Sequence, residues 1–261
     1  MKAKKVVKVL VHGILGNPFT SLKKRIEQEG YEVVNVFFPY QDPSRSDYQD
    51  PRLATIGVKD KVDHLIKILV QLQAEGKEYD LVGHSAGALV SLLAACFPGI
   101  KPRKKILISP VGMRGIWMIQ PSVLWTFLNI TFTWGFFRKK VKLSYEKFVY
   151  SMLNKIPSEV DRRRIYDDMC EESGKFIFQI GFWPFDRTKA TQVQLKNIAC
   201  NVRILAGDKD RAAPLVIAKA TLKRLLKTGD SRYSHTLKVF KGCGHWLFEE
   251  RPEEIVREIC G

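Results

Sequence analysis

Ser85 lies at the centre of the segment Gly83-His84-Ser85-Ala86-Gly87, between an apolar run that ends at Val82 and an apolar stretch that continues to Phe97. Glycines two positions before and after the serine allow a turn too tight for a Cβ, in which strained backbone dihedrals push the serine hydroxyl outward. The string Gly-x-Ser-x-Gly is weak evidence alone. A strand before it and a helix after it are typical of a nucleophilic serine on a sharp strand-to-helix turn.

Three further loops carry groups that such a serine would need, because a serine hydroxyl is a poor nucleophile until a neutral imidazole accepts its proton. Each loop follows a short apolar or alternating run that predicts a strand. They are the glycine-bearing loop of His12 after 6–11, the turn of Asp208 and Asp210 after 201–206, and the glycine-flanked loop of His245 after 235–240.

The order of these loops resembles the α/β-hydrolase superfamily, in which an oxyanion loop, the nucleophile, the acid and the histidine each follow a strand. Four motifs carry the resemblance: His-Gly-x-x-Gly at 12–16, Gly-His-Ser-x-Gly at 83–87, Gly-x-x-Asp-x-x-x-Pro at 207–214 and Gly-x-Gly-His at 242–245. The likeness spans about 6–111 and 201 to the end of the chain. It implies a serine hydrolase that needs no cofactor and no metal.

Roles for the catalytic residues follow from chemistry and from the resemblance together. Ser85 would attack a carbonyl carbon, and His245 would take its proton and later return it. A buried carboxylate must hold the second ring nitrogen of that histidine. Asp210 and Asp208 are the two candidates, and the family spacing to Gly207 and Pro214 favours Asp210.

The resemblance also assigns an oxyanion hole and suggests a substrate pocket. Backbone N–H groups of Ile14 and Ala86 would stabilise the negative charge of a tetrahedral intermediate. Side chains expected at the pocket are His12, His84, Trp117, Trp125 and Trp246.

Apolar runs and helical stretches alternate along the chain, which predicts an α/β fold with a mostly parallel sheet. Strands are expected at 6–11, 32–38, 79–82, 104–109, 201–206 and 235–240, giving about six. Helices are expected at 21–29, 56–75, 87–97, 215–227 and 252–260. Residues 1–111 and 201–261 would form the core domain.

The stretch 112–200, after the strand that ends near Ser109, is far longer than a crossover requires and predicts a helical cap. Its uncharged, aromatic-rich run at 115–137 is long enough to be considered as a membrane span. A crossing there would place Ser85 and His245 on opposite sides of a bilayer, so cap helices with an apolar substrate pocket are the better interpretation. Interfacial membrane contact, helped by the basic cluster at 138–142, is an alternative.

Charge and cysteine content bound the partners and the compartment. The 43 Lys and Arg residues against 27 Asp and Glu give a net charge of +16, which attracts anionic partners such as an acidic carrier protein or a membrane surface. No nucleic-acid motif accompanies the charge. Five cysteines without a Cys-x-x-Cys pair predict free thiols and a reducing, cytoplasmic location.

Three functions remain open at this point. The first is hydrolysis of a carboxylic ester or related acyl bond, such as a lactone, through an acyl-enzyme on Ser85. The second is a thioesterase or methyl esterase that acts on acyl groups bound to a carrier protein or to coenzyme A. The third is a ligand receptor on the same fold with slow turnover or none.

Overall fold

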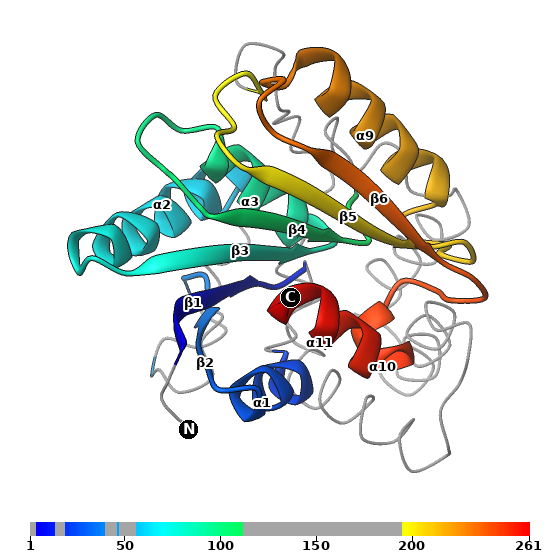
Figure 1. The fold of residues 1–261 in the computed structure, drawn as a ribbon, viewed down its shortest axis with the longest axis horizontal. Coiled ribbons are helices and arrows are strands. Elements are labelled where there is room, and N and C mark those ends of the chain that lie inside the picture. Colours follow the sequence, from blue (N-terminus) through cyan, green and yellow to red (C-terminus); the bar gives the residue numbers. More distant parts are fainter. Residues whose placement is uncertain (1–3, 14–18, 40–45, 47–55, 112–194) are drawn as a thin grey trace, which may run out of the picture.

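The computed structural model of the protein describes residues 4–13, 19–39, 46, 56–111 and 195–261. Within these ranges the chain forms one twisted sheet with helices on both faces (Figure 1). The predicted cap at 112–200 lies outside the described residues, apart from 195–200.

Six parallel strands form the sheet, in the order β2-β1-β3-β4-β5-β6. They are β1 (Lys4–Val11), β2 (Tyr31–Val36), β3 (Glu78–His84), β4 (Lys104–Ile108), β5 (Asn201–Gly207) and β6 (His235–Phe240). This confirms the α/β fold and the six-stranded sheet expected from the sequence. Since all strands run the same way, the loops that follow them meet at one edge of the sheet.

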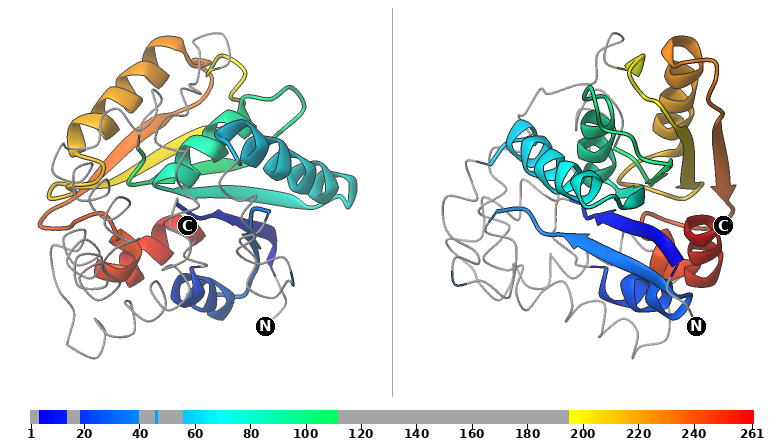
Figure 2. Two further views of the ribbon diagram at one scale, coloured as in Figure 1. Left: turned by 180° about the vertical axis from the view of Figure 1, so that it is seen from behind. Right: turned by 60° about the vertical axis from the view of Figure 1, so that its left-hand side comes forward.

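Helices cover the sheet in two layers, and the views in Figures 1 and 2 agree on their sides. One face carries α2 (Val58–Ala74), α3 (Ala86–Ala95) and α9 (Leu215–Thr228), and the other carries α1 (Thr20–Gln28), α10 (Leu247–Glu250) and α11 (Pro252–Cys260). The five expected helices are present, and their ends differ by no more than two residues. The short helix α10 was not predicted. No described helix has the length and apolar character needed to span a bilayer.

Strand side chains alternate between two buried cores, one on each face of the sheet. On β4, Leu107 packs with the helices α2 and α3, while Ile106 and Ile108 pack with α1 and α11. Burial on both faces explains why the central strands read as continuous apolar runs.

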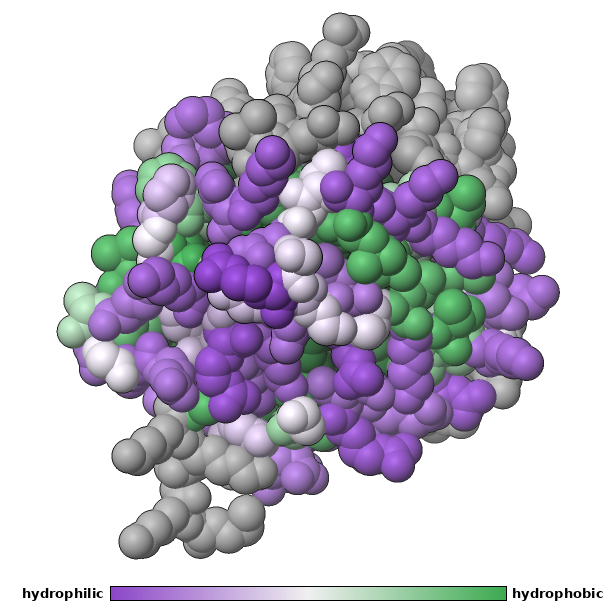
Figure 3. Space-filling view, turned by 45° about the horizontal axis from the view of Figure 1, so that its top comes forward, coloured by the Kyte–Doolittle hydropathy of each residue, from purple (hydrophilic) through white to green (hydrophobic). Residues whose placement is uncertain are grey.

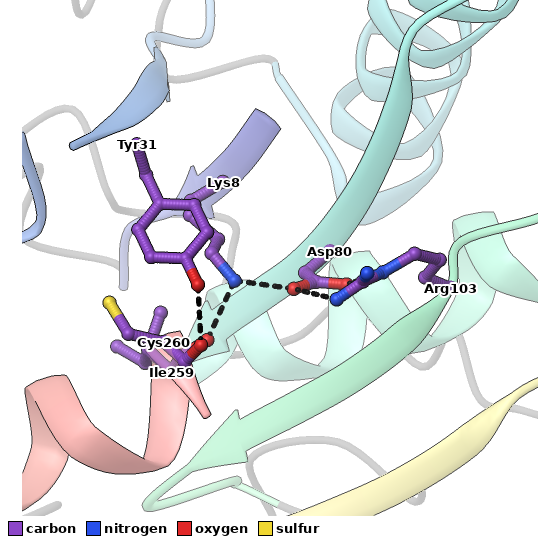
Figure 4. Close-up of polar contacts among 6 residues, drawn as sticks. All are labelled: Lys8, Tyr31, Asp80, Arg103, Ile259 and Cys260. Atoms are coloured by element: carbon purple, nitrogen blue, oxygen red, sulfur yellow. Dashed lines mark hydrogen bonds and ion pairs between the residues drawn. The ribbon is translucent and has the colours of Figure 1, made fainter. Parts of the chain in front are cut away.

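Polar side chains hold the carboxyl end of α11 against the sheet (Figure 4). The Nζ of Lys8 on β1 lies 2.6 Å from Oδ2 of Asp80 on β3, and it donates to the Ile259 carbonyl oxygen at 2.8 Å. The Tyr31 hydroxyl donates to the Cys260 carbonyl oxygen at 2.6 Å. A cation near the last carbonyls of a helix is favourable, so this cluster fixes the end of α11 on the fold.

Candidate active site

Ser85 occupies a strained turn between β3 and α3. Its backbone has φ 53° and ψ −120°, a conformation that is unusual for a residue other than glycine. A Cβ at Gly83 would overlap the Gly87 carbonyl oxygen, and a Cβ at Gly87 would overlap the backbone of His12. Both glycines are therefore required by close backbone approach, and the turn has the geometry expected from the motif.

His245 and Asp210 are paired although they lie on different loops. The Nδ1 of His245 is 2.8 Å from Oδ2 of Asp210, and the two residues are only 3% and 4% exposed. The other carboxylate oxygen of Asp210 accepts hydrogen bonds from the backbone N–H groups of Ala212 at 2.9 Å and Ala213 at 2.7 Å. One oxygen thus anchors the carboxylate to its own turn, and the other orients the imidazole.

Asp208 has a different position from Asp210, although both follow β5. It is exposed, and its Oδ1 accepts a hydrogen bond from the backbone N–H of Gly242 at 2.7 Å. Lys209 donates its N–H to the carbonyl oxygen of Cys243 at 2.9 Å. These contacts join the turn after β5 to the loop after β6, which carries His245.

His84 connects the serine turn to the histidine loop. Its Nε2 lies 3.1 Å from the backbone carbonyl oxygen of His245, and the two rings are 4.8 Å apart between centroids. Burial lowers the pKa of His84 well below its usual value, and the nearby His245 lowers it further. The ring is therefore neutral, and because a carbonyl oxygen only accepts, Nε2 carries the proton.

Glu250 on α10 supports the same loop from the opposite side. Its Oε1 accepts a hydrogen bond from the backbone N–H of Gly244 at 2.8 Å. Glu250 could not be predicted from the sequence, since a four-residue helix leaves no periodic signal and the contact depends on a turn of the chain after Trp246. The sequence feature that could have indicated Glu250 is a carboxylate shortly after the Gly-x-Gly-His motif.

The loop after β1 lies against the serine turn. A Cβ at Gly13 would come within 3.1 Å of the Cβ of Ser85. The Nδ1 of His12 lies 2.7 Å from the Gly13 carbonyl oxygen, and the ring packs on Phe38 with 5.2 Å between ring centroids. Burial lowers the pKa of His12 to about 4, so its ring is neutral, and a neutral ring bonds the carbonyl oxygen as a donor.

Of the remaining predicted site residues, Ala86 and Trp246 lie within the described ranges. Ala86 is the first residue of α3, where backbone N–H groups have no partner within the helix. The Trp246 side chain is 3% exposed and packs in the core with Leu247 and Phe248. Ile14, Trp117 and Trp125 lie outside the described residues.

The site therefore offers a hydroxyl, an imidazole held by a carboxylate, and helix N–H groups at one edge of the sheet. This set of groups is suited to proton transfer and to stabilising an oxyanion. Within the described ranges, no three His, Cys, Asp or Glu side chains gather as metal ligands would.

Comparisons with known proteins agree with this architecture. Residues 9–258 match the model of the alpha/beta hydrolase family. An esterase from Exiguobacterium antarcticum is similar in structure, with a TM-score of 0.76 at 16% identity over 100% of this chain and 92% of that one. So is the 2-hydroxy-6-oxo-6-phenylhexa-2,4-dienoate hydrolase of a Rhodococcus species, with a TM-score of 0.73 at 16% identity over 98% and 90%.

A carboxylesterase from Bacillus subtilis gives a TM-score of 0.69 at 15% identity over 99% of this chain and 84% of that one. Comparison with curated protein sequences gives no match. At identities this low, the structural likeness shows a shared fold alone. The family model, in contrast, matches almost the whole chain. The chain therefore belongs to the α/β-hydrolase family.

Proposed function

We propose that the chain is a serine hydrolase that cleaves carboxylic esters through an acyl-enzyme formed on Ser85. The observation that carries this proposal is the buried pair of His245 and Asp210, 2.8 Å apart, whose histidine is bonded through its backbone to His84, the neighbour of Ser85. An imidazole oriented by a carboxylate beside a strained serine is the arrangement that activates a hydroxyl for acyl transfer.

The first half of the reaction forms the acyl-enzyme. The Oγ of Ser85 attacks the ester carbonyl carbon while Nε2 of His245 accepts the hydroxyl proton. Asp210 keeps the Nδ1 proton of that histidine in place and stabilises the imidazolium. Negative charge on the former carbonyl oxygen is held by the backbone N–H groups of Ala86 and Ile14. Collapse of the intermediate releases the alcohol, which takes the proton from His245.

The second half returns the enzyme to its starting state. Water gives a proton to His245 and attacks the acyl carbon, and the second tetrahedral intermediate expels the Ser85 oxygen, which recovers its proton from the imidazolium. Atoms and charges balance as ester plus water giving acid plus alcohol. No other reactant takes part.

The substrate class is proposed from the aromatic-rich segment 115–137, whose side chains, Trp117 and Trp125 among them, would line an apolar acyl or aromatic pocket. His12, His84 and Trp246 stay predictions as pocket residues. Medium or aromatic acyl esters should then turn over faster than acetates, and equal rates for both would contradict the pocket.

Active-site labelling tests the mechanism directly. A fluorophosphonate should modify the protein with a stoichiometry of one at Ser85, and the Ser85→Ala variant should neither be labelled nor turn over a p-nitrophenyl ester. Labelling at another residue would overturn the assignment. Labelling at Ser85 without turnover of any ester would favour the receptor.

The carrier-bound alternative is favoured by the charge of +16, which would attract an acidic acyl carrier. Turnover of two substrates with the same acyl chain, one a thioester and one a free ester, distinguishes this alternative from the ester function. Preference for the carrier or coenzyme A thioester over the free p-nitrophenyl ester would replace the proposed function with a thioesterase.

A further inference from the structure

The outward face of α9 combines lysines with exposed aliphatic side chains. Lys219, Lys223 and Lys227 recur every four residues and are all exposed. Val216 and Leu226 are 62% and 63% exposed, and the 3.6-residue period places them among these lysines. The opposite side of α9 is buried in the core through Ile217, Ala218, Thr221, Leu225 and Thr228. This outward set of five residues is called the α9 face below.

Within the described residues, the lysines of the α9 face lack acidic partners of the kind that Lys23 and Lys59 have on other helices. On α1, Lys23 pairs with Glu27, and on α2, Lys59 pairs with Asp63, each four residues further on. The sequence of α9 contains no acidic residue, and no ion pair reaches its three outward lysines in the described part of the chain. Within the described ranges, no acidic side chain compensates their charge.

A hollow of about 540 Å³ continues the α9 face at the carboxyl end of the helix. It is lined by Lys196, Lys227, Thr228, Gly229, Asp230 and Ser231. Figure 3 brings this end of the molecule forward and shows apolar surface directly beside hydrophilic surface.

The carboxylate in the hollow does not cancel the charge of its lysines. Asp230 is held by the guanidinium of Arg232, with contacts of 2.6 Å and 2.9 Å to Oδ2. Arg232 also lowers the pKa of that carboxyl group. Because Arg232 compensates the charge of Asp230, Lys196 and Lys227 leave the hollow positive, and the Ser231 hydroxyl could donate to an anion's oxygen atoms. The Thr228 hydroxyl donates instead to the Arg224 carbonyl oxygen at 2.8 Å.

We propose that the α9 face and its hollow form a docking surface for an anionic phospholipid bilayer, with a headgroup phosphate in the hollow. Charge complementarity selects an anionic partner. The residue composition of the α9 face favours a membrane over an acidic protein. Lysine is depleted at the centre of protein interfaces, whereas aromatic residues and arginine are enriched there. Lysines beside aliphatic residues suit a bilayer surface, where the amines reach phosphates and the aliphatic groups enter the acyl boundary.

The position of α9 relates this surface to the loops of the candidate active site. The helix begins at Leu215, just after the turn that holds Asp210, and it runs to the opposite edge of the sheet (Figure 1). Contact along α9 would lay one flank of the sheet on the bilayer. The loop edge would then border the lipid surface, where apolar substrates accumulate.

Vesicle binding by the full chain tests the proposal. The protein should sediment with vesicles of phosphatidylcholine containing 30 mol% phosphatidylglycerol and should remain free with phosphatidylcholine alone. Each lysine neutralised near an anionic surface should weaken partitioning about fivefold, so Lys219→Gln with Lys223→Gln should weaken it about 25-fold. Lys24→Gln with Lys67→Gln on α1 and α2 removes the same charge and should have little effect. Equal losses in both double variants would overturn the proposal.

A second pair of variants separates a bilayer from an acidic protein. Leu226→Ser should weaken vesicle binding about fivefold, because less apolar area enters the bilayer. Val70→Ser on α2, where Val70 is 50% exposed, is the matched control and should leave binding unchanged. Retained p-nitrophenyl ester turnover and melting temperature show that each variant is folded. Unchanged vesicle binding of Leu226→Ser, with polyglutamate binding lost in the α9 lysine variant, would replace the bilayer with an acidic protein.

Discussion

Asp80 and Asp210 are both buried carboxylates bonded to a basic side chain, but the partners differ in kind. Asp80 lies within β3 and contacts two basic side chains, Lys8 at 2.6 Å and Arg103, whose Nε is 3.2 Å away. Asp210 lies on a loop and binds His245, a residue type whose charge changes near neutral pH. The strand cluster joins β1, β3 and the end of α11 and serves stability, while the loop pair contains a histidine, a side chain suited to proton transfer.

The largest expected effect is the loss of activity in Asp210→Asn. The asparagine would keep its oxygen for the N–H groups of Ala212 and Ala213, but its amide would donate toward His245 and force the wrong tautomer. Turnover of a p-nitrophenyl ester should fall about 10⁴-fold with little change in melting temperature. Asp208→Asn keeps the acceptor for Gly242 and should retain activity. Similar losses in both variants would break the distinction between the two aspartates.

At the other carboxylate, Asp80→Asn should reduce stability rather than catalysis. It leaves the buried Lys8 amine without its carboxylate partner, which should lower the free energy of unfolding by about 3–5 kcal/mol in urea titrations. Replacing both partners, as Lys8→Met with Asp80→Leu, should restore most of the lost free energy of unfolding because no uncompensated charge remains. A double variant no more stable than Asp80→Asn would contradict this account.

Lys105 on β4 sharpens the comparison because its charge is buried without a counterion among the described residues. It is 0% exposed, its Nζ has no hydrogen bond within the same ranges, and burial lowers its pKa from 10.5 to about 7. Lys105→Met should stabilise the protein by roughly 5 kcal/mol at pH 6 in urea titrations, the free energy equivalent to that shift of pKa.

The stabilisation expected from Lys105→Met should depend on pH. Between about pH 7 and pH 10.5, the unfolded chain binds a proton at Lys105 that the folded protein lacks. The unfolding free energy of the unmodified protein therefore rises with pH across this window. The advantage of Lys105→Met should be largest below pH 7 and shrink toward pH 10. A constant difference across this range would show that Lys105 is not neutral in the fold.

The smallest expected effect concerns His84, which we treat as a positioning residue. His84→Leu removes the donor to the His245 carbonyl oxygen and should lower kcat about tenfold, since one positioning hydrogen bond contributes on the order of 1–1.5 kcal/mol, with little change in KM. His84→Gln can place an amide N–H at the same position and should recover most of the rate. A rise in KM alone, or no rescue by glutamine, would assign His84 to substrate contact instead.

Much of the fold could be predicted because its signals are local. Runs such as 104–109 and 201–206 have the length and apolar content of buried strands, and the glycines around Ser85 are imposed by the turn that they form. Strand ends were less accurate: β3 extends from Glu78 to His84, beyond the expected 79–82. Backbone pairing with β1 and β4 lengthens the strand beyond its apolar run.

Contacts between distant loops were predictable only as far as the order of motifs. Sequence spacing favoured Asp210 over Asp208, and the structure pairs Asp210 with His245 while Asp208 bonds Gly242. The support from Glu250 was not predicted, and the bond between His84 and the His245 backbone was not specified, because each joins residues whose separation depends on how the loops fold back.

By itself, then, the sequence determined the alternation of strands and helices, the tight turn at Ser85 and the order of the motif-bearing loops along the chain, since these depend on neighbouring residues or on sequence order alone. Tertiary structure alone decided which lysines are buried and what they contact: Lys8 lies against Asp80, and Lys105 has no hydrogen-bond partner among the described residues. The reason is that burial and pairing depend on strand order and helix packing, which bring together residues far apart in the chain.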